Sequence, residues 1–132
     1  MMAQYTQAAI VSELKRLAVP ASADSIPSSA MQEDHVSMGW SAARKLRRAV
    51  DGLTRVLAIE LLTAARGIEL RAPLLPSQAT AAVIAALRQT THGPGPDRFV
   101  APEIDAAVDF VAGGHAVRAV EAVTGPLNQE TR

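Results

Sequence analysis

The sequence predicts an all-α fold, with long antiparallel helices that form part of an oligomeric helical bundle. Three observations support this prediction. Apolar residues recur at the three- and four-residue spacing of helices, no segment alternates convincingly as a strand would, and prolines separate the periodic segments. At 132 residues the chain has the length of a single domain, and its 48% of hydrophobic residues is enough for a core.

A first helix is expected over residues 1–19, with Ile10, Leu14 and Leu17 at helical spacing. It ends before Pro20, because proline pushes the preceding residue out of the α conformation. The apolar pattern starts without a capping residue, which is typical of a segment excised from a longer protein.

Residues 20–34 are predicted to form a loop, which leads into the polar cluster Gln32-Glu33-Asp34-His35. Four polar or ionisable side chains in a row are poor core residues, so they indicate either a helix cap or a site for a polar substrate. In the first interpretation, Asp34 or Ser37 accepts hydrogen bonds from the free N–H groups of the next helix.

A long core helix over residues 35–70 is the main structural prediction. Its apolar seam alternates steps of four and three residues, and consists of Leu46, Val50, Leu53, Leu57, Leu61, Ala64 and Ile68. Residues 56–65 are apolar on nearly every face, so we expect other chains, or a missing part of the same chain, to cover them. Gly52 costs about 1 kcal/mol relative to alanine in a helix, and it is predicted to mark a close helix contact.

Two shorter helices complete the prediction. Ser77 is expected to cap a helix over residues 77–91, after a segment in which two prolines end the long helix. Pro102 opens a helix over residues 102–113, which two glycines end. The last residues, from 115 to 132, are weakly patterned and are expected to fray.

Composition argues against several classes of function. The formal net charge is zero and aromatic residues make up only 3%, so no nucleic-acid partner is predicted. No run of about 18 uncharged apolar residues occurs, so no membrane partner is predicted either. The absence of cysteine excludes disulfides and thiolate metal sites. Since no secretory signal is visible, we expect a cytoplasmic location.

Motif spacing gives no metal site, because no second histidine follows His35 at the spacing of a zinc-binding helix. His92 and His115 are expected to be solvated in loops. A Ser-His-Asp triad is compatible with the spacing, but no Gly-x-Ser-x-Gly elbow is present, and the glycine-proline loop lacks the lysine of a phosphate loop.

The segment from Ser29 to Gly39 strongly resembles the Ser-Ala-Asn-Gln-Glu-Asp-His-Val-Ser-Met segment of the histidine ammonia-lyases. The Gln-Glu-Asp-His tetrad is fairly specific, since the related phenylalanine and tyrosine ammonia-lyases and aminomutases have glutamine at the position of Glu33. The resemblance extends over nearly the whole chain, through residues 20–27, 42–45, 56–62 and 97–104.

The resemblance implies a reaction, a cofactor and a site. The family converts L-histidine to trans-urocanate and ammonia with a methylidene-imidazolone group made from an internal Ala-Ser-Gly. Its members are largely helical homotetramers whose active sites are built from several subunits. By match of motif, Glu33 is the catalytic glutamate that binds the substrate imidazole, and a carboxylate can accept its N–H. Gln32 is a weaker substrate-binding candidate, which with His35 is expected to orient the loop.

Two departures from the family pattern matter. The sequence contains no Ala-Ser-Gly, so it resembles only the C-terminal portion of a larger lyase and is expected to be inactive alone. The electrophile and the tyrosine of the family's base chemistry would belong to the missing N-terminal portion. In addition, Met31 replaces the family's usual asparagine, and Val19 stands where histidine is common.

Two alternatives stay open on the sequence. The chain could be a non-catalytic helical oligomerisation module or lyase remnant, as its apolar long helix allows. It could also be part of another aromatic amino-acid lyase or aminomutase, which Glu33 in place of glutamine disfavours.

Overall fold

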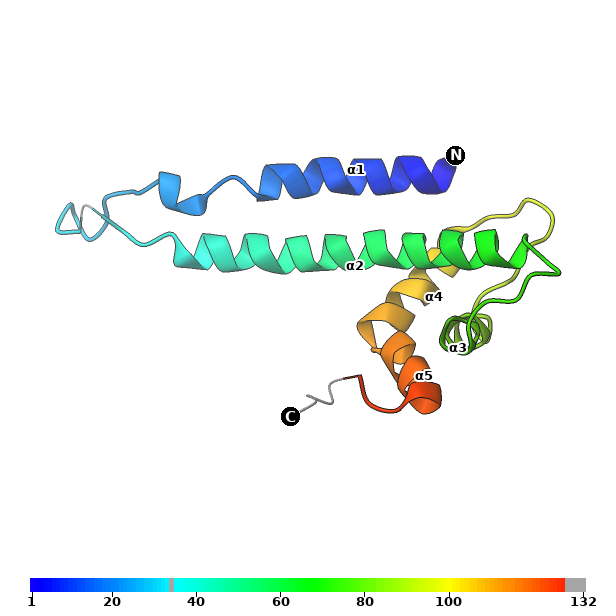
Figure 1. The fold of residues 1–132 in the computed structure, drawn as a ribbon. Helices are drawn as coiled ribbons and strands as arrows, with labels where there is room; N and C mark the ends of the chain where they lie inside the picture. Colours follow the sequence, from blue (N-terminus) through cyan, green and yellow to red (C-terminus); the bar gives the residue numbers. More distant parts are fainter. Residues whose placement is uncertain (34, 128–132) are drawn as a thin grey trace. The chain divides into compact units, whose positions relative to one another are not determined.

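The structure is a computed structural model that describes residues 1–33 and 35–127. Over these residues it has five α-helices, one short 3-10 helix and no strand apart from one isolated bridge (Figure 1). The predicted all-α class is therefore confirmed. The chain divides into two compact units, Met1–Val56 and Leu57–Arg132, and each is described by itself.

In the first unit, α1 (Met2–Leu17) runs antiparallel to the beginning of α2 (Gly39–Glu69), as Figure 1 shows. Contacts join the start of α1 to later residues of α2 and its end to earlier ones. The Gln7 side-chain amide donates to the carbonyl O of Val56 at 3.0 Å, and Arg48 Nη2 lies 3.2 Å from Glu13 Oε1. The two helices therefore form an antiparallel pair, as the sequence predicted.

The two helices approach each other closely at Gly52. A Cβ built on Gly52 would lie only 2.9 Å from Leu14 Cδ2 and 3.4 Å from Ile10 Cγ2. Real Cβ atoms essentially never lie that close to another heavy atom, so the Leu14 side chain would have to shift if residue 52 carried a Cβ. The predicted close helix contact is confirmed.

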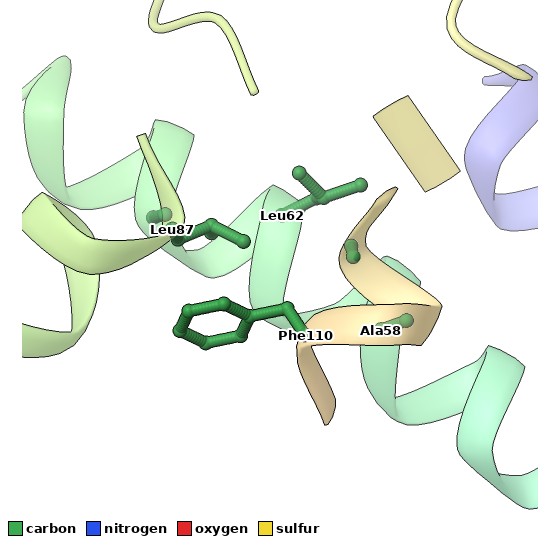
Figure 2. Close-up of a cluster of buried hydrophobic side chains, with 6 residues drawn as sticks. Ala58, Leu62, Leu87 and Phe110 are labelled. Atoms are coloured by element: carbon green, nitrogen blue, oxygen red, sulfur yellow. The ribbon is translucent and has the colours of Figure 1, made fainter. Parts of the chain in front are cut away.

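The second unit contains the end of α2 together with α3 (Gln78–Leu87), α4 (Ala101–Ala112) and α5 (His115–Thr124). Helix α5 packs mainly on α3 and also on α4. Figure 2 shows the ring of Phe110 from α4 beside Leu87 of α3, with Leu62 of α2 in the same cluster. The packed cluster of buried residues consists of Ala58, Leu62, Ala65, Leu87, Ala107 and Phe110, and Ile59 is buried as well.

The helix ends of the second unit follow local sequence signals. The Ser77 hydroxyl accepts a hydrogen bond from the N–H of Thr80 at 3.3 Å, so its predicted role as a cap is confirmed. Pro102 and Glu103 lie in the first turn of α4, which begins at Ala101, and Gly113 ends the helix. Helix α3 ends at Leu87, four residues before the predicted end. There the Leu87 carbonyl O accepts hydrogen bonds from both the hydroxyl and the N–H of Thr91, at 2.9 and 3.2 Å.

Two further expectations about the helices are wrong. The long helix begins at Gly39 and not at residue 35, because the Ser25 side chain binds both the N–H and the carbonyl O of Val36 and holds it outside the helix. His115–Thr124 form α5 instead of fraying, because Gly114 adopts a φ of 69° that redirects the chain and Ala116 packs on the core. Residues 128–132, which were also expected to fray, lie outside the described residues.

Asp34 and Ser37 were the two residues predicted to cap the long helix, and the structure describes one of them, Ser37. The Ser37 hydroxyl accepts a hydrogen bond from the N–H of Gly39, the first residue of α2, at 3.3 Å. Asp34, the other predicted cap, lies outside the described residues. No helix in the described part of the chain is long and apolar enough to cross a membrane.

The predicted apolar seam of α2 lies largely on the surface of the chain. The exposed fractions of Leu46, Val50 and Leu53 are 66%, 52% and 50%. The buried residues of α2 lie on another face and consist of Ala58, Ile59, Leu62 and Ala65. The described residues of the first unit therefore leave these three side chains exposed. Within residues 56–65, which were expected to need another chain to cover them, Ala58, Ile59, Leu62 and Ala65 are already buried by the described chain.

Candidate functional site

The polar cluster lies in a loop between α1 and α2 whose base is closed by one serine. After Pro20 the chain forms a 3-10 turn, η1 (Ala21–Ala23), and then becomes extended. The Ser25 hydroxyl accepts from the N–H of Val36 at 2.9 Å and donates to its carbonyl O at 3.3 Å. A single side chain thus ties together two residues that are eleven positions apart in the sequence.

The tip of the same loop is closed by backbone hydrogen bonds. The N–H of Ser28 donates to the carbonyl O of Glu33 at 2.8 Å, and the N–H of Glu33 donates to the carbonyl O of Ser28 at 3.2 Å. Inside this pair, the N–H of Gln32 donates to the carbonyl O of Ser29 at 3.1 Å. The backbone at Gln32 and Glu33 is therefore fixed within the loop.

Three consecutive residues make this tip unusual. Ser29, Ala30 and Met31 have φ values of 53°, 52° and 68°, in the left-handed region that favours glycine. An L-residue costs about 1–2 kcal/mol in that conformation, because its Cβ approaches the following carbonyl oxygen. We name these three residues the left-handed turn. No glycine or asparagine marks it in the sequence, so sequence analysis missed it.

The side chains of Gln32, Glu33 and His35 are all exposed on this loop. An exposed carboxylate on a fixed backbone can accept a hydrogen bond from a ligand N–H, and the bond strengthens where a further surface excludes water. Within residues 1–33 and 35–127, no group of three or more His, Cys, Asp or Glu side chains is placed to hold a metal ion.

A cavity of about 330 Å³ lies at the start of this loop, in the first unit. Its only charged lining residue is Lys45, whose ammonium group donates to the carbonyl O of Val19. The lining consists of Leu14, Leu17, Ala18, Val19, Pro20, Ala21, Ala42, Lys45, Leu46 and Ala49. Glu33 is not among these residues, so the cavity is separate from the candidate glutamate.

In the second unit, two arginines are paired with glutamates. Arg88 donates from Nε and Nη2 to the Glu69 carboxylate at 2.8 and 2.6 Å, and from Nη1 to the Thr91 hydroxyl at 3.0 Å. The hydrogen bonds from Arg88 lower the pKa of Glu69, although burial opposes this shift. This contact joins the residue after α3 to the end of α2.

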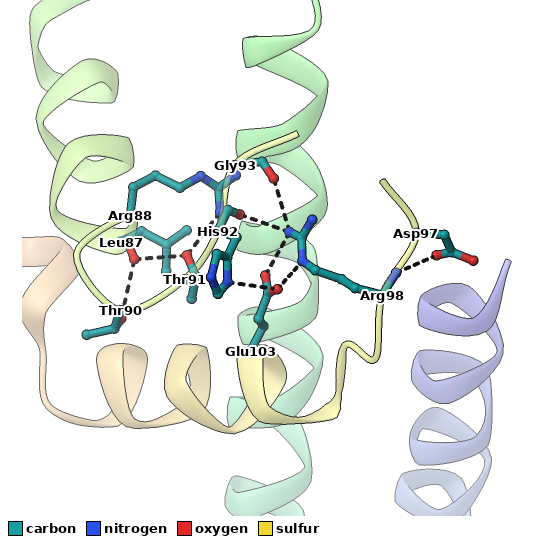
Figure 3. A network of polar contacts seen from close by, with 9 residues as sticks. All are labelled: Leu87, Arg88, Thr90, Thr91, His92, Gly93, Asp97, Arg98 and Glu103. Atoms are coloured by element: carbon teal, nitrogen blue, oxygen red, sulfur yellow. Dashed lines mark hydrogen bonds and ion pairs between the residues drawn. The ribbon is translucent and has the colours of Figure 1, made fainter. Parts of the chain in front are cut away.

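A second arginine pair holds the loop between α3 and α4 (Figure 3). Arg98 donates from Nε and Nη2 to Glu103, and from Nη2 to the carbonyl O of Gly93 at 3.0 Å. Hydrogen bonding from Arg98 lowers the pKa of Glu103, and the same contact raises the pKa of Arg98. We call these two ion pairs, Arg88 with Glu69 and Arg98 with Glu103, the arginine clasps.

The two other histidines belong to this unit. The ring of His92 is 80% exposed, as predicted, but its Nδ1 also lies 3.4 Å from Glu103 Oε1. His115 is not in a loop, because it is the first residue of α5 and its ring stacks on Phe110 at a centroid distance of 5.6 Å. Both histidines thus have structural contacts in the second unit.

Comparison with known proteins gives strong similarity to one group of enzymes. Residues 1–89 match the family described as aromatic amino acid lyase. The chain is 70% identical over 128 residues to a histidine ammonia-lyase of Streptomyces avermitilis, and 54% identical over 127 residues to one of Symbiobacterium thermophilum. In both cases 96% of this chain is covered but only 25% of the relative, so the chain spans about a quarter of the length of these relatives.

Solved structures are similar as well. The crystal structure of histidine ammonia-lyase from Trypanosoma cruzi matches with a TM-score of 0.87 and 41% sequence identity, over 92% of this chain and 24% of that one. A tyrosine aminomutase from Streptomyces globisporus matches with a TM-score of 0.83 and 35% identity, over 91% of this chain and 23% of that one.

Proposed function

The chain belongs to the aromatic amino acid lyase family, and we propose that it is the C-terminal part of a histidine ammonia-lyase that converts L-histidine to trans-urocanate and ammonia. Within that enzyme its role is to contribute Glu33 to an active site that other parts of the protein complete. The observation that carries the proposal is the tetrad from Gln32 to His35 on a hydrogen-bonded loop, in a chain 70% identical to histidine ammonia-lyases.

Glu33 is proposed to bind the imidazole of the substrate. Its carboxylate accepts a hydrogen bond from an imidazole N–H, and it can assist the movement of that proton. The exposure of Glu33 in this chain supports the idea that further protein surface covers it in the complete enzyme, where exclusion of water would strengthen the contact. Gln32, the weaker substrate-binding candidate, is proposed to help orient the loop.

The electrophile is proposed to come from elsewhere in the enzyme. In this family a methylidene-imidazolone group, formed from an internal Ala-Ser-Gly, supplies the electrophile. The 132 residues contain no Ala-Ser-Gly, so this chain cannot form the group from its own backbone. We therefore expect the isolated chain to be inactive, with an N-terminal lyase portion and further subunits, in a homotetramer, as its partners.

The exposed seam of α2 supports association with such partners. Leu46, Val50 and Leu53 are at least half exposed, and a row of large apolar side chains on one helix face is typical of a surface that packs against protein. The same observation favours a second candidate function, a helical oligomerisation module without catalysis. The two candidates differ in whether Glu33 affects the turnover of histidine.

A chimera tests the proposal. The matching quarter of the Streptomyces avermitilis histidine ammonia-lyase is replaced with this chain, and urocanate absorbance is followed after addition of L-histidine. We expect turnover by the chimera, none by the isolated chain, and a loss of about a hundredfold in kcat/KM in the chimera with Glu33→Gln. Glu121→Gln is the matched control, because a glutamine oxygen can still accept from the N–H of Leu127.

The outcomes separate the candidates. Turnover by the isolated chain would overturn the division of the active site between this chain and the rest of the enzyme. An active chimera in which Glu33→Gln has no larger effect than Glu121→Gln would remove the proposed role of Glu33 and favour the oligomerisation module.

A further inference from the structure

The left-handed turn directly precedes Gln32 and Glu33 in a loop that is closed at both ends. The backbone pair of Ser28 and Glu33 closes the tip, and the Ser25 hydroxyl closes the base on Val36. Between the two residues of the tip pair, the chain must reverse its direction within four residues. It does so through consecutive φ values of 53°, 52° and 68° at residues that are not glycine.

We propose that the left-handed turn positions the Glu33 carboxylate, and that Met31 is the residue that limits how fully the turn is populated. This inference rests on the proposed function of Glu33. The turn sets the direction of the backbone at Glu33, which is hydrogen-bonded to Ser28. It therefore also sets the direction in which the Glu33 side chain leaves the backbone. If the turn relaxed to ordinary negative φ values, the two hydrogen bonds between Ser28 and Glu33 would be lost and the carboxylate would move.

Met31 is the member of the turn next to Gln32 and Glu33, and its side chain does little to stabilise its backbone conformation. Its side chain is 79% exposed, so its packing contributes little to holding the loop. It also has the largest φ of the three residues, at 68°. Asparagine adopts the left-handed conformation more readily than other residues with a Cβ, while a β-branched residue is a clear outlier there. Position 31 thus acts on Glu33 through the backbone.

Two substitutions in the chimera test this inference in opposite directions. Met31→Val should lower kcat/KM for L-histidine about tenfold, and Met31→Asn should raise it about twofold or more. The matched control is Met2→Val, which makes the same change at an exposed methionine in α1, and it should alter kcat/KM by less than about twofold.

A double-mutant cycle with Glu33→Gln distinguishes positioning from a general effect on folding. If the turn acts through Glu33, both Met31 substitutions should change kcat/KM by less than about twofold in the Glu33→Gln background. If Met31→Val lowers kcat/KM by the same factor in both backgrounds, the turn does not position Glu33 and the inference is overturned, while the proposed function stands.

The remaining outcomes are also decisive. If Glu33→Gln alone leaves histidine turnover unchanged, the proposed function fails first and the inference fails with it. If Met31→Val does not fold, Met31→Asn decides. A gain that disappears in the Glu33→Gln background supports the inference, and no gain overturns it.

Discussion

The two units differ in how completely they bury their own residues. No described residue of the first unit, Met1–Val56, is buried, whereas the second unit, Leu57–Arg132, contains the whole buried core. Both units pair charges, but the pairs of Glu13 with Arg16 and Arg48 in the first unit are exposed, whereas the arginine clasps of the second unit are partly buried. In the first unit, the apolar side chains of Leu46, Val50 and Leu53 face outwards, as does the candidate glutamate Glu33.

This difference indicates which unit is suited to bind a substrate or another protein surface. A core whose polar groups are hydrogen-bonded needs no partner to be stable. A pair of helices with a row of exposed apolar side chains is stabilised when another protein surface covers that row. The proposed site lies in the first unit, where side chains are available to a substrate or to other protein surface.

Truncation of one leucine in each unit should have very different effects on stability. Leu87 is fully buried, so Leu87→Ala should lower the free energy of unfolding by about 2–5 kcal/mol. Leu46 is 66% exposed, so Leu46→Ala should lower it by at most about 1 kcal/mol. Urea denaturation of the two variants at low protein concentration measures both values. An equally large loss for Leu46→Ala would show that the seam is buried in solution.

A pair of glycines in α2 gives a matched comparison. A Cβ on Gly67 would meet no atom within 4 Å, so Gly67→Ala should stabilise the chain by about 0.5–1 kcal/mol through helix propensity. At Gly52 the same Cβ would lie 2.9 Å from Leu14 Cδ2, so Gly52→Ala should be less stable than Gly67→Ala by about 1–2 kcal/mol.

The same urea titration decides this comparison. Equal effects at the two glycines would mean that Leu14 moves aside easily and that α1 is only loosely packed on α2. A larger loss at Gly52 would show that close contact between these helices persists in solution, even though the first unit has no buried core.

The helical spacing and the Ser77 cap were predicted because they depend on neighbouring residues. The close contact at Gly52 was predicted because glycine is unfavourable inside a helix, although its neighbour Leu14 is distant in the sequence. The start of α2 was not predicted, because it is decided by Ser25 bonding to Val36 from eleven residues away.

The same limit applies to the polar features. Arg88 and Glu69 are 19 residues apart and are adjacent only after folding, so no local pattern marks their contact. The left-handed turn was missed because its residues do not favour its conformation. Glu33 was singled out by family resemblance, and its role stays a prediction until turnover is measured.

The smallest expected effect concerns pH and belongs to the second unit. The arginine clasps lower the pKa values of Glu69 and Glu103 below their ordinary value of 4.5 in the folded state. Between the folded and the unfolded pKa values, the unfolded chain binds more protons, so the free energy of unfolding falls as the pH drops through this range. The stabilisation is fully present above the ordinary carboxyl pKa and is lost as the pH passes below the lowered values.

Unfolding measured in urea between about pH 6 and about pH 3 checks this dependence. Replacing both carboxylates, by Glu69→Gln and Glu103→Gln, should make the free energy of unfolding depend less on pH across the acidic range, since two groups that titrate differently in the folded and unfolded states are removed. An unchanged slope in the double variant would mean that the clasps do not stabilise the folded chain electrostatically. The second unit would then owe its stability to its apolar core alone, and the contrast between the units would be one of packing rather than of charge.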